Sequence, residues 1–518
     1  MLTWRAAFLA ALFFLLQPIA GVTQDVTLTS RDGSVEISGA LIGYDGEFYR
    51  VDSVYGVLTL DGSGVLCSGP ACPDLKAYVA EIRVSGEAAV TQHLMPVLIE
   101  TFAELQGYDV LRRVRGDDDF AYVLIETASG RESARFILRT TTSEEAFADL
   151  VAEEADIAFS LREADADEVA LGVEAGIGQL DAAKQFRVLA LDALVPVVAS
   201  GNPVARITLH DLARAFSGEI TNWQDLGGAD APVILHLPHE GSALSAVFGQ
   251  LVTRVVPPLP GEILRHETTA DLVDAVARDP FALGVATLSE LGGAKPLPLT
   301  DACGYLARAA TEALKTEDYP LTAPMFLYLP QRRIPAAGRD FLRFTQSAAA
   351  QHAIRRAGFA DQTLTETPIG QQGNRLSNAI RSAVPEAGLN PLQDMLEKLD
   401  GFDRLSVSFR FDGGSTALDA QSRSNVGLLA QAIETGLYDG RDMIFVGFSD
   451  GDGDAEANRR LSRQRATTVR DDVVKMATMA DLSLTNLDAL GYGEAMPMAC
   501  DDTDWGRRIN RRVEVWVR

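Results

Sequence analysis

Two charged residues near the C-terminus have the types and spacing of a binding site for a zwitterion. Asp450 follows a short apolar run, and Arg465 lies further on, in a segment with the pattern of a helix. A carboxylate holds an ammonium group, and a guanidinium holds a carboxylate through two parallel hydrogen bonds. The two residues therefore either clamp a ligand that carries both groups or pair with each other as an ordinary ion pair.

A strand, a turn and a helix are expected to position these two residues. Residues 443–448 are continuously apolar, which is typical of a strand that is buried on both faces. Asp454 is a suitable N-cap for the helix that follows. In that helix Arg465 shares one face with Leu461 and Val469. An arginine on an apolar face needs an anion or must reach towards solvent.

Ordered motifs around this pair resemble the OmpA-like peptidoglycan-binding domain. They are Ser449-Asp450, Asn458, Leu461-Ser462, Arg465-Ala466, Gly491-Tyr492-Gly493-Glu494 and Asn510-Arg511-Arg512-Val513-Glu514. The resemblance implies that Asp450 and Arg465 hold the diaminopimelate of the peptidoglycan stem peptide. It also implies that the peptidoglycan-binding site includes Ser449, Asn458 and Arg511. An acidic, Gly-rich insert at 451–454 departs from the family and would lie at the rim of this site.

Composition and the N-terminus indicate an exported acidic protein. The 518 residues include 46 Lys and Arg and 72 Asp and Glu, which gives a formal net charge of −26. Nucleic acid and anionic lipid surfaces would repel such a chain, so neither is an expected partner. Residues 1–22 have the layout of a secretory signal peptide, and no later segment is long and apolar enough for a transmembrane span. With peptidoglycan as the implied ligand, the expected location is the periplasm of a Gram-negative bacterium, at the cell wall and outer-membrane side.

The four cysteines fit an oxidising compartment. Cys67 and Cys72 flank the turn-forming spacer Ser-Gly-Pro-Ala, which favours a local disulfide. A metal pair is the alternative, but no second pair of ligands has comparable spacing. The sequence leaves open whether Cys303 and Cys500 pair.

The pattern along the chain predicts an α/β protein built from several units. Residues 23–76 alternate apolar and polar side chains with frequent Gly and Asp, which predicts a small β-rich module. From 78 to 360 strands alternate with helical patterns, as in a parallel or mixed sheet with crossover helices. Residues 361–394 are expected to be a linker with a short helix, and residues 395–518 a C-terminal α/β sandwich.

Residues 78–360 resemble the substrate-binding proteins of the phosphate ABC-importer family, which have a two-lobed periplasmic-binding-protein fold of type II. The most specific segment is Ser217-Gly218-Glu219-Ile220-Thr221-Asn222-Trp223. The resemblance implies that a small anion or other solute is held between the lobes, which close about a hinge. The implied anion-binding and solute-binding residues are Ser85, Gly86, Asp156, Ser160, Arg162, Gly241 and Ser242.

Two departures from that family remove hydroxyl donors from the implied cleft. Glu87-Ala88-Ala89 follows Gly86, and Ala243-Leu244 follows Ser242, where the family usually offers hydroxyl groups. Each missing donor would leave anion oxygens without hydrogen bonds, at about 1 to 3 kcal/mol apiece. We therefore expect weak or absent phosphate binding, and a different anion, a zwitterion or a degenerate site are the alternatives.

No catalytic centre, cofactor site or metal site is expected. A nucleophile, a base and an orienting group cannot be assembled from the sequence order. His236, His239 and Glu240 have the residue types of metal ligands, but Pro238 interrupts them and the preceding residues have the pattern of a strand.

The leading hypothesis is a non-enzymatic periplasmic solute-binding or anion-binding protein that is tethered to peptidoglycan. The alternative is the substrate-binding subunit for ABC import of phosphate or a related oxyanion, with an ABC permease as its partner. An envelope hydrolase is a third class, which rests only on the N-terminal module whose function the sequence does not indicate.

Overall fold

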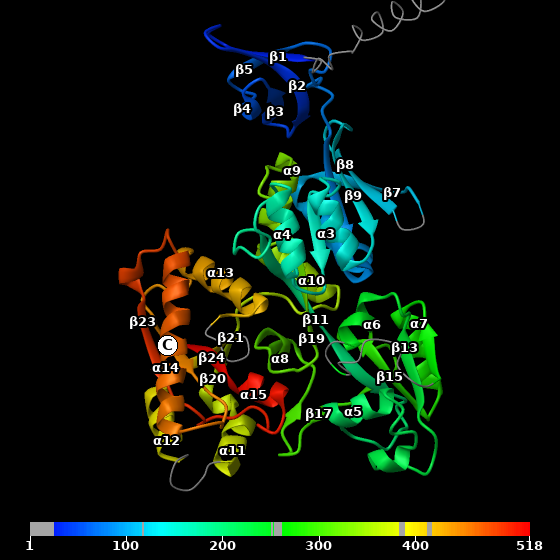
Figure 1. Cartoon of the computed structure of the whole chain (residues 1–518), viewed down its shortest axis with the longest axis vertical. Helices are drawn as coiled ribbons and strands as arrows, with labels where there is room; N and C mark the ends of the chain where they lie inside the picture. Colours follow the sequence, from blue (N-terminus) through cyan, green and yellow to red (C-terminus); the bar gives the residue numbers. More distant parts are fainter. Residues whose placement is uncertain (1–24, 117–118, 250–251, 253–261, 383–388, 412–416) are drawn as a thin grey trace, which may run out of the picture.

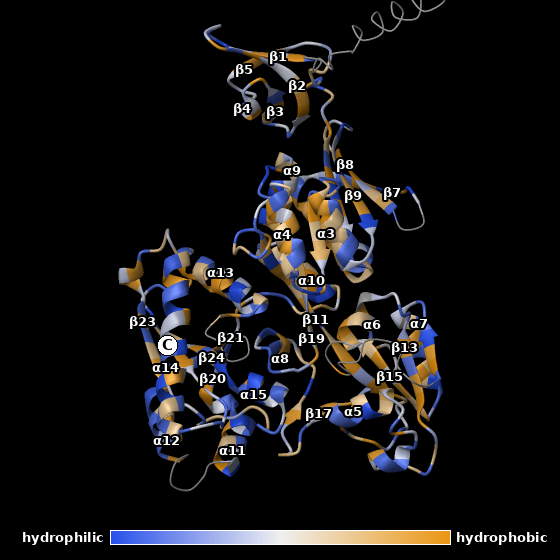
Figure 2. Cartoon of the chain, viewed as in Figure 1, coloured by the Kyte–Doolittle hydropathy of each residue, from blue (hydrophilic) through white to orange (hydrophobic). Residues whose placement is uncertain are grey.

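The structure is a computed structural model, and it describes residues 25–116, 119–249, 252, 262–382, 389–411 and 417–518. The expected signal peptide lies outside the described residues. Figure 1 shows a small β module, a two-lobed central unit and a C-terminal unit beside it. Figure 2 shows hydrophobic residues gathered in the strands and helices of the first lobe, as expected for a packed core.

The N-terminal module is an antiparallel sheet in the order β4-β3-β2-β1-β5. Its strands are β1 (Val26–Ser30), β2 (Glu36–Tyr44), β3 (Phe48–Ser53), β4 (Gly56–Asp61) and β5 (Val65–Ser68). Its core consists of Val26, Leu28, Tyr49 and Val51. Such a small core buries little apolar area, and a disulfide from Cys67 in β5 to Cys72 adds a covalent constraint.

The first lobe of the central unit is a sheet with helices on its faces. Its strands are β6 (Ala80–Gly86), β7 (Tyr108–Val114), β8 (Asp119–Glu126), β9 (Glu132–Thr140) and β10 (Ile157–Ser160). Its helical segments are η1 (Ala89–Leu94), α2 (Met95–Gln106), α3 (Ser143–Val151), α4 (Ala166–Glu174), α9 (Ala336–Phe344) and α10 (Ala348–Arg356). Strand β6 pairs in parallel with both β9 and β10, so the carboxyl ends of these strands meet at one edge.

The second lobe is smaller and is joined to the first by a long shared strand. Its elements are α5 (Leu209–Phe216), β13 (Ile234–Pro238), α6 (Ala243–Phe248), β14 (Ile263–His266), α7 (Thr269–Arg278) and β15 (Ala282–Thr287). The shared strand, β11 (Phe186–Val198), pairs first with β19 (Thr322–Tyr328) and then with β15. Because β11 is almost entirely apolar and buried, it serves as a core strand of both lobes.

Short elements lie between the second lobe and the C-terminal unit. Strands β12 (Ile207–Thr208), β17 (Leu299–Thr300) and β18 (Leu306–Ala307) form a small sheet, β16 (Lys295–Pro296) pairs with β11, and α8 (Thr311–Lys315) precedes β19.

The C-terminal unit is a sheet with helices on both faces, in the strand order β20-β21-β24-β22-β23. Its strands are β20 (Glu366–Pro368), β21 (Asp403–Arg410), β22 (Asp442–Gly447), β23 (Asn486–Gly491) and β24 (Arg512–Val517). Its helices are α11 (Gly373–Ser382), α12 (Leu389–Lys398), α13 (Ala420–Glu434), α14 (Ala455–Met476) and α15 (Asp504–Asn510). Residues of α13 and α14 pack on one face, and residues of α11 and α12 on the other.

The described residues of the segment 361–394, for which a linker with a short helix was expected, are packed on the C-terminal unit, and α11 lies where the short helix was expected. Residues 366–368 form the edge strand β20, which pairs with β21, and α11 places Ala379 in a buried cluster. The Gln, Gly, Asn and Pro content of this segment suggested a loop, but tertiary packing overrides that local preference.

The C-terminal unit contacts the first lobe and the segment that follows the second lobe. A Cys303–Cys500 disulfide ties it to the loop between β17 and β18, with the two Cα atoms 5.5 Å apart. On the first lobe, the backbone N–H of Val188 donates to Ser424 Oγ at 2.9 Å. Buried Arg410, at the end of β21, donates to Oδ1 of Asp318, which lies between α8 and β19, at 2.8 Å. None of the described helices combines the length and apolar character needed to cross a membrane.

Candidate functional site

Asp450 and two arginines form the centre of the C-terminal candidate site. Asp450 follows β22, and its Oδ2 accepts a hydrogen bond from Nη1 of Arg511 at 2.6 Å. This ion pair differs from the simple alternative of an Asp450–Arg465 pair. Both side chains keep some exposure, 13% for Asp450 and 16% for Arg511, so a ligand could reach them.

Arg465 lies next to this ion pair on the buried face of α14. Its guanidinium is 5.0 Å from the ring centroid of Phe411. Burial lowers the pKa of Arg465, and the charge of Arg511 lowers it further, whereas the charge of Asp450 raises it. The two guanidinium groups therefore act on one carboxylate, which leaves the surroundings of Asp450 favourable for a second anionic group.

Ser449 and Asn458 support the site in different ways. The amide of Asn458 donates to the backbone oxygens of Asp450 and Asp452, at 3.3 and 3.0 Å, so Asn458 shapes the loop that carries Asp450. Ser449 is buried, and its Oγ has no hydrogen-bond partner among the residues that the structure describes. A buried hydroxyl without a partner is unfavourable unless a ligand or water supplies one.

Some residues of the Asn510 to Glu514 motif lie at the candidate site, and others lie in the core. Arg511 points to Asp450, whereas Arg512 and Glu514 form a buried ion pair with 2.7 Å between Nε and Oε1. Asn510 donates to the backbone oxygen of Ala499 at 2.8 Å and fixes that loop. In this motif only Arg511 is therefore placed to meet a ligand.

The second candidate site is a cavity of about 100 Å³ between the lobes. It brings together Arg162, Gly241 and Ser242, in agreement with the grouping that the resemblance implied. Ser85, Gly86 and Ser160 do not line this cavity. Gly86 is needed for packing, because a Cβ there would lie 2.7 Å from the backbone oxygen of Phe159.

Hydroxyl groups at and near the cleft already donate to acceptors within the protein. The bonds are Ser85 Oγ to Asp149 Oδ2 at 2.5 Å, Ser143 Oγ to Glu87 Oε1 at 2.8 Å, Ser160 Oγ to the Arg162 oxygen at 2.7 Å, and Ser242 Oγ to the His239 oxygen at 2.7 Å. An anion in the cleft would have to compete with each of these bonds for a donor.

Arg162 is also engaged within the protein. Its Nη2 lies 3.0 Å from Glu144 and 2.7 Å from Glu168, and its guanidinium is 5.3 Å from the ring centroid of Phe147. The hydrogen bond to Glu168 is the largest cause of the raised pKa of Arg162, so the cation is held firmly. Two carboxylates reduce the attraction of Arg162 for an anionic ligand.

Glu87 places a titratable carboxyl at the same cavity. It is 7% exposed, and burial raises its pKa from 4.5 to about 7, while the hydrogen bond from Ser143 opposes that shift. At neutral pH this side chain is therefore divided between the neutral and the anionic form. Its anionic form would repel a bound anion.

Asp156 does not belong to this cleft, contrary to the expectation. It precedes β10, whereas Ser160 ends that strand, so the two residues lie at opposite edges of the sheet. Asp156 accepts hydrogen bonds from the backbone of Arg83 at 2.8 Å and from Nη1 of Arg332 at 2.9 Å.

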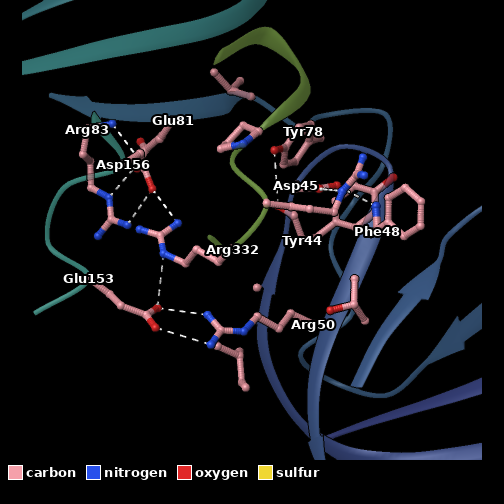
Figure 3. Close-up of a pocket in the computed structure, with 16 residues that line it drawn as sticks. Tyr44, Asp45, Phe48, Arg50, Tyr78, Glu81, Arg83, Glu153, Asp156 and Arg332 are labelled. Atoms are coloured by element: carbon pink, nitrogen blue, oxygen red, sulfur yellow. Dashed lines mark hydrogen bonds and ion pairs between the residues drawn. The ribbon is translucent and has the colours of Figure 1, made fainter. Parts of the chain in front are cut away.

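A second cavity, of about 490 Å³, surrounds Asp156 between the β module and the first lobe. Figure 3 shows the charged side chains that line it, and Arg50 of the β module reaches Glu153 of the first lobe at 2.9 Å. Arg333, which also lines this cavity, lies 3.2 Å from Asp45 of the β module. These paired charges join the module to the lobe.

Three cleft residues, Thr142, Ser143 and Glu144, were not identified from the sequence. A local signal was available, since Thr142 accepts a hydrogen bond from the backbone of Glu145 and caps α3. A helix start after β9 falls at the carboxyl edge, where ligands bind in such sheets. The histidine string does not assemble, because His236 instead contacts His266, with 2.9 Å between Nδ1 and Nε2.

Two family descriptions match the chain. The PBP superfamily domain matches residues 80–349, which is more than half of the chain, and the OmpA family matches residues 410–511. Both are families of binding or structural proteins rather than of enzymes.

Individual relatives divide between the same two regions. Outer membrane porin F of Pseudomonas fluorescens is 31% identical over 114 residues, which are 22% of this chain and 33% of porin F. The phosphate-binding protein PstS of Bacillus subtilis is 27% identical over 165 residues, which are 31% of this chain and 53% of PstS. The crystal structure of an ABC-type phosphate transport receptor from Vibrio cholerae is 20% identical, with a TM-score of 0.41, over 54% of this chain and 98% of that receptor.

The chain thus spans about a third of the length of porin F and about half that of PstS. A binding domain joined to an OmpA domain fits a binding protein that is tethered to the cell wall, and the porin relatives point to the Gram-negative envelope. The chain belongs to the PBP superfamily and carries an OmpA family domain near its C-terminus.

Proposed function

We propose that this protein is a non-enzymatic periplasmic binding protein whose C-terminal domain holds it to diaminopimelate-type peptidoglycan. The observation that carries this proposal is the grouping of Asp450, Arg465 and Arg511 beside the buried hydroxyl of Ser449. One carboxylate and two guanidinium groups match a ligand centre that bears an ammonium and a carboxylate.

Recognition follows from the charges of the site. The ammonium of the ligand binds Asp450, and its carboxylate binds the guanidinium side, where Arg465 and Arg511 both favour an anion. Ser449 Oγ supplies a further hydrogen bond. Asp450 and Arg511 are paired with each other and partly exposed. Binding replaces that ion pair by two charge-assisted contacts, one from Asp450 to the ammonium of the ligand and one from the guanidinium groups to its carboxylate.

The central cleft is proposed to bind a small anion or zwitterion weakly rather than phosphate tightly. Three features oppose the binding of a multiply charged anion. The hydroxyl groups already donate to acceptors within the protein, Arg162 is paired with two carboxylates, and Glu87 lies nearby. Isothermal titration with phosphate, sulfate and small amino acids tests this assignment. A submicromolar phosphate dissociation constant, which requires about 8 kcal/mol, would contradict it.

An importer subunit for phosphate, working with an ABC permease, is the second candidate because PstS matches the central unit. Contacts of the C-terminal unit with the first lobe and with the segment after the second lobe speak against it, since lobe closure is part of such binding proteins. A wall-bound protein would also reach a permease less easily. Normal phosphate uptake in a deletion strain grown on limiting phosphate would rule out the importer function.

Sedimentation with purified sacculi tests the wall-binding function. Asp450→Asn removes the charge but hardly changes the side-chain volume, and Arg465→Ala removes one guanidinium. Each change should weaken binding by roughly 2 to 5 kcal/mol, enough to abolish co-sedimentation.

Arg460→Ala is the matched control, because Arg460 lies on the same helix and is 68% exposed, in a pair with Glu456. It should sediment like the wild type. Thermal melts of all variants identify loss of fold. If folded Asp450→Asn and Arg465→Ala still sediment with sacculi, the C-terminal site has no role in wall binding.

A further inference from the structure

A larger cavity lies where the first lobe meets the C-terminal unit. Its volume is about 550 Å³, within the usual range of small-molecule sites. One wall comes from the beginning of β11 and from residues before and within α10, and the other from α13. Figure 1 shows α13 on the side of the C-terminal unit that faces the first lobe.

The lining is apolar and carries positive charge. The apolar side chains include Phe186, Val188, Leu189, Leu329, Leu364, Leu428 and Leu437. The charged ones are Lys184, Arg187 and Arg423, and no Asp or Glu is present among the described residues of the lining. In a chain with 72 acidic and 46 basic residues, a cavity with cations only is unexpected and complements an anion.

Arg187 is a partly buried cation of the lining, and no described carboxylate pairs with it. Its Nη2 donates to the backbone oxygen of Leu342 at 2.9 Å and to Thr345 Oγ1 at 2.6 Å, and no ion pair joins it to another described residue. Burial lowers the pKa of Arg187 to about 10, as expected for a guanidinium without a counter-ion.

Two buried arginines between the central and C-terminal units, Arg404 and Arg410, differ from the partly buried Arg187 in this respect. Arg404 and Arg410 both reach Asp318, at 3.2 and 2.8 Å. At the cavity itself, Arg423 is paired with Glu163 at 3.2 Å. Buried charges in proteins are normally paired, so the exception at Arg187 marks a place for an anion from outside the chain.

We propose that this cavity binds an amphipathic anion, an acyl chain with a carboxylate or phosphate head group. The head group pairs with Arg187, and the acyl chain lies along the leucines and Phe186. Such a ligand satisfies the charge and also removes its own apolar surface from water. This site is separate from both the wall site and the cleft between the lobes.

Calorimetry and native mass spectrometry on the full-length protein test the proposal with dodecanoate and dodecyl phosphate below their micelle concentrations. Dodecyltrimethylammonium controls for the acyl chain alone, and inorganic phosphate for the head group alone. We expect one anionic amphiphile per chain, at least tenfold tighter than the cationic amphiphile. The stronger of the two anionic probes identifies the head group. Equal binding of the cationic amphiphile would overturn the proposal.

Two substitutions locate the ligand. Arg187→Gln should weaken binding of the anionic probe at least tenfold, but it also removes a partly buried guanidinium and its hydrogen bonds to Leu342 and Thr345. Gly427→Leu avoids that difficulty, because Gly427 lines the cavity on α13 and an added Cβ meets no atom within 4 Å. It fills the cavity and also replaces a helical glycine, so the fold should be kept.

Gly373→Leu is the matched control, since Gly373 is on α11, outside the cavity, and also has open space around a Cβ. Binding should be lost in Gly427→Leu and kept in Gly373→Leu, while both still sediment with sacculi. Unchanged binding of dodecanoate and dodecyl phosphate by Gly427→Leu would place any bound ligand elsewhere and refute the proposal.

Discussion

Individual side chains decide what each site of this protein can hold. The charges at Asp450, Arg465 and Arg511 suit a zwitterion, whereas the cleft between the lobes combines one arginine with several carboxylates. Glu87 is the most informative of these carboxylates, because it follows β6 directly and occupies a position where a hydroxyl donor was expected.

Stability should depend on the protonation of Glu87. Its pKa in the folded protein is raised from 4.5 to about 7, so the folded state favours the neutral form. The contribution of this group to stability is full below pH 4.5, is lost as pH rises towards 7, and changes little above that. Glu87→Gln removes the free-energy cost of burying a charged carboxylate and retains an acceptor for Ser143 Oγ. Its stabilisation should be about 2 kcal/mol larger at pH 8 than at pH 5, as measured by urea unfolding.

Glu126→Gln serves as the control of opposite sign. Glu126 is partly exposed, and hydrogen bonds from Ser129 and Arg131 lower its pKa, so its contribution to stability is present above its ordinary pKa and is lost at lower pH. Glu126→Gln should therefore destabilise more at pH 8 than at low pH. An equal effect of Glu87→Gln at both values of pH would mean that Glu87 is not the buried titrating group described.

The sequence placed part of these residues together, for Asp450 and Arg465 through residue type and spacing and for the others through the family resemblances. Asp450, Arg465 and Arg511 come together as their motifs implied, and Arg162, Gly241 and Ser242 share the cleft. Asp156 could not be placed, because the sequence does not show which edge of a sheet a residue faces until the strand direction is known. The sequence also did not show that Asp450 pairs with Arg511, because the two residues lie 61 positions apart along the chain.

The elements of the C-terminal unit are packed closely around Asp450 and Arg465, the centre of the proposed wall-binding site. A strand at 443–448 and a helix after Asp454 were both predicted, and β22 and α14 occupy those positions. Their apolar pattern is strong, so local signals sufficed. Residues 361–394 have weak local signals, and β20 and α11 form there because the neighbouring sheet and core accept them.

Gly447 shows how closely β22 approaches α14. A Cβ at this position would lie 1.9 Å from the backbone oxygen of Ser462, so the helix would have to move. Gly447→Ala should destabilise the protein by roughly 3 kcal/mol and shift the loop that carries Asp450. Thermal melts and sacculus binding at low temperature measure the two effects.

Gly427→Ala is the comparison within the same unit. Its Cβ meets open space on a helix, so it should be neutral or stabilise by up to about 1 kcal/mol. If Gly447→Ala were as stable as Gly427→Ala, β22 and α14 could not approach each other as closely as described.

At the scale of the whole molecule, the C-terminal unit is held against the central unit at two places. It reaches the first lobe through Ser424 and the segment after the second lobe through the Cys303–Cys500 disulfide. The sequence could not reveal this arrangement, since two cysteines that lie 197 positions apart give no local signal. The C-terminal unit and the central unit are thus joined by a covalent bond as well as by packing.

Removal of the long-range disulfide should therefore have a larger effect than removal of the local one. The Cys303–Cys500 bond closes a long loop, with a sequence separation of 197, whereas Cys67 and Cys72 are separated by 5. Because the entropy of a cross-linked unfolded chain falls with loop length, the difference between the two losses should be about 3 kcal/mol. Urea unfolding of the two double-serine variants measures it. Limited proteolysis should also cut the Cys303→Ser/Cys500→Ser variant faster near residues 361–365, where the units join. A larger loss of stability from the Cys67 and Cys72 pair would contradict the role of the Cys303–Cys500 disulfide in holding the C-terminal unit against the central unit.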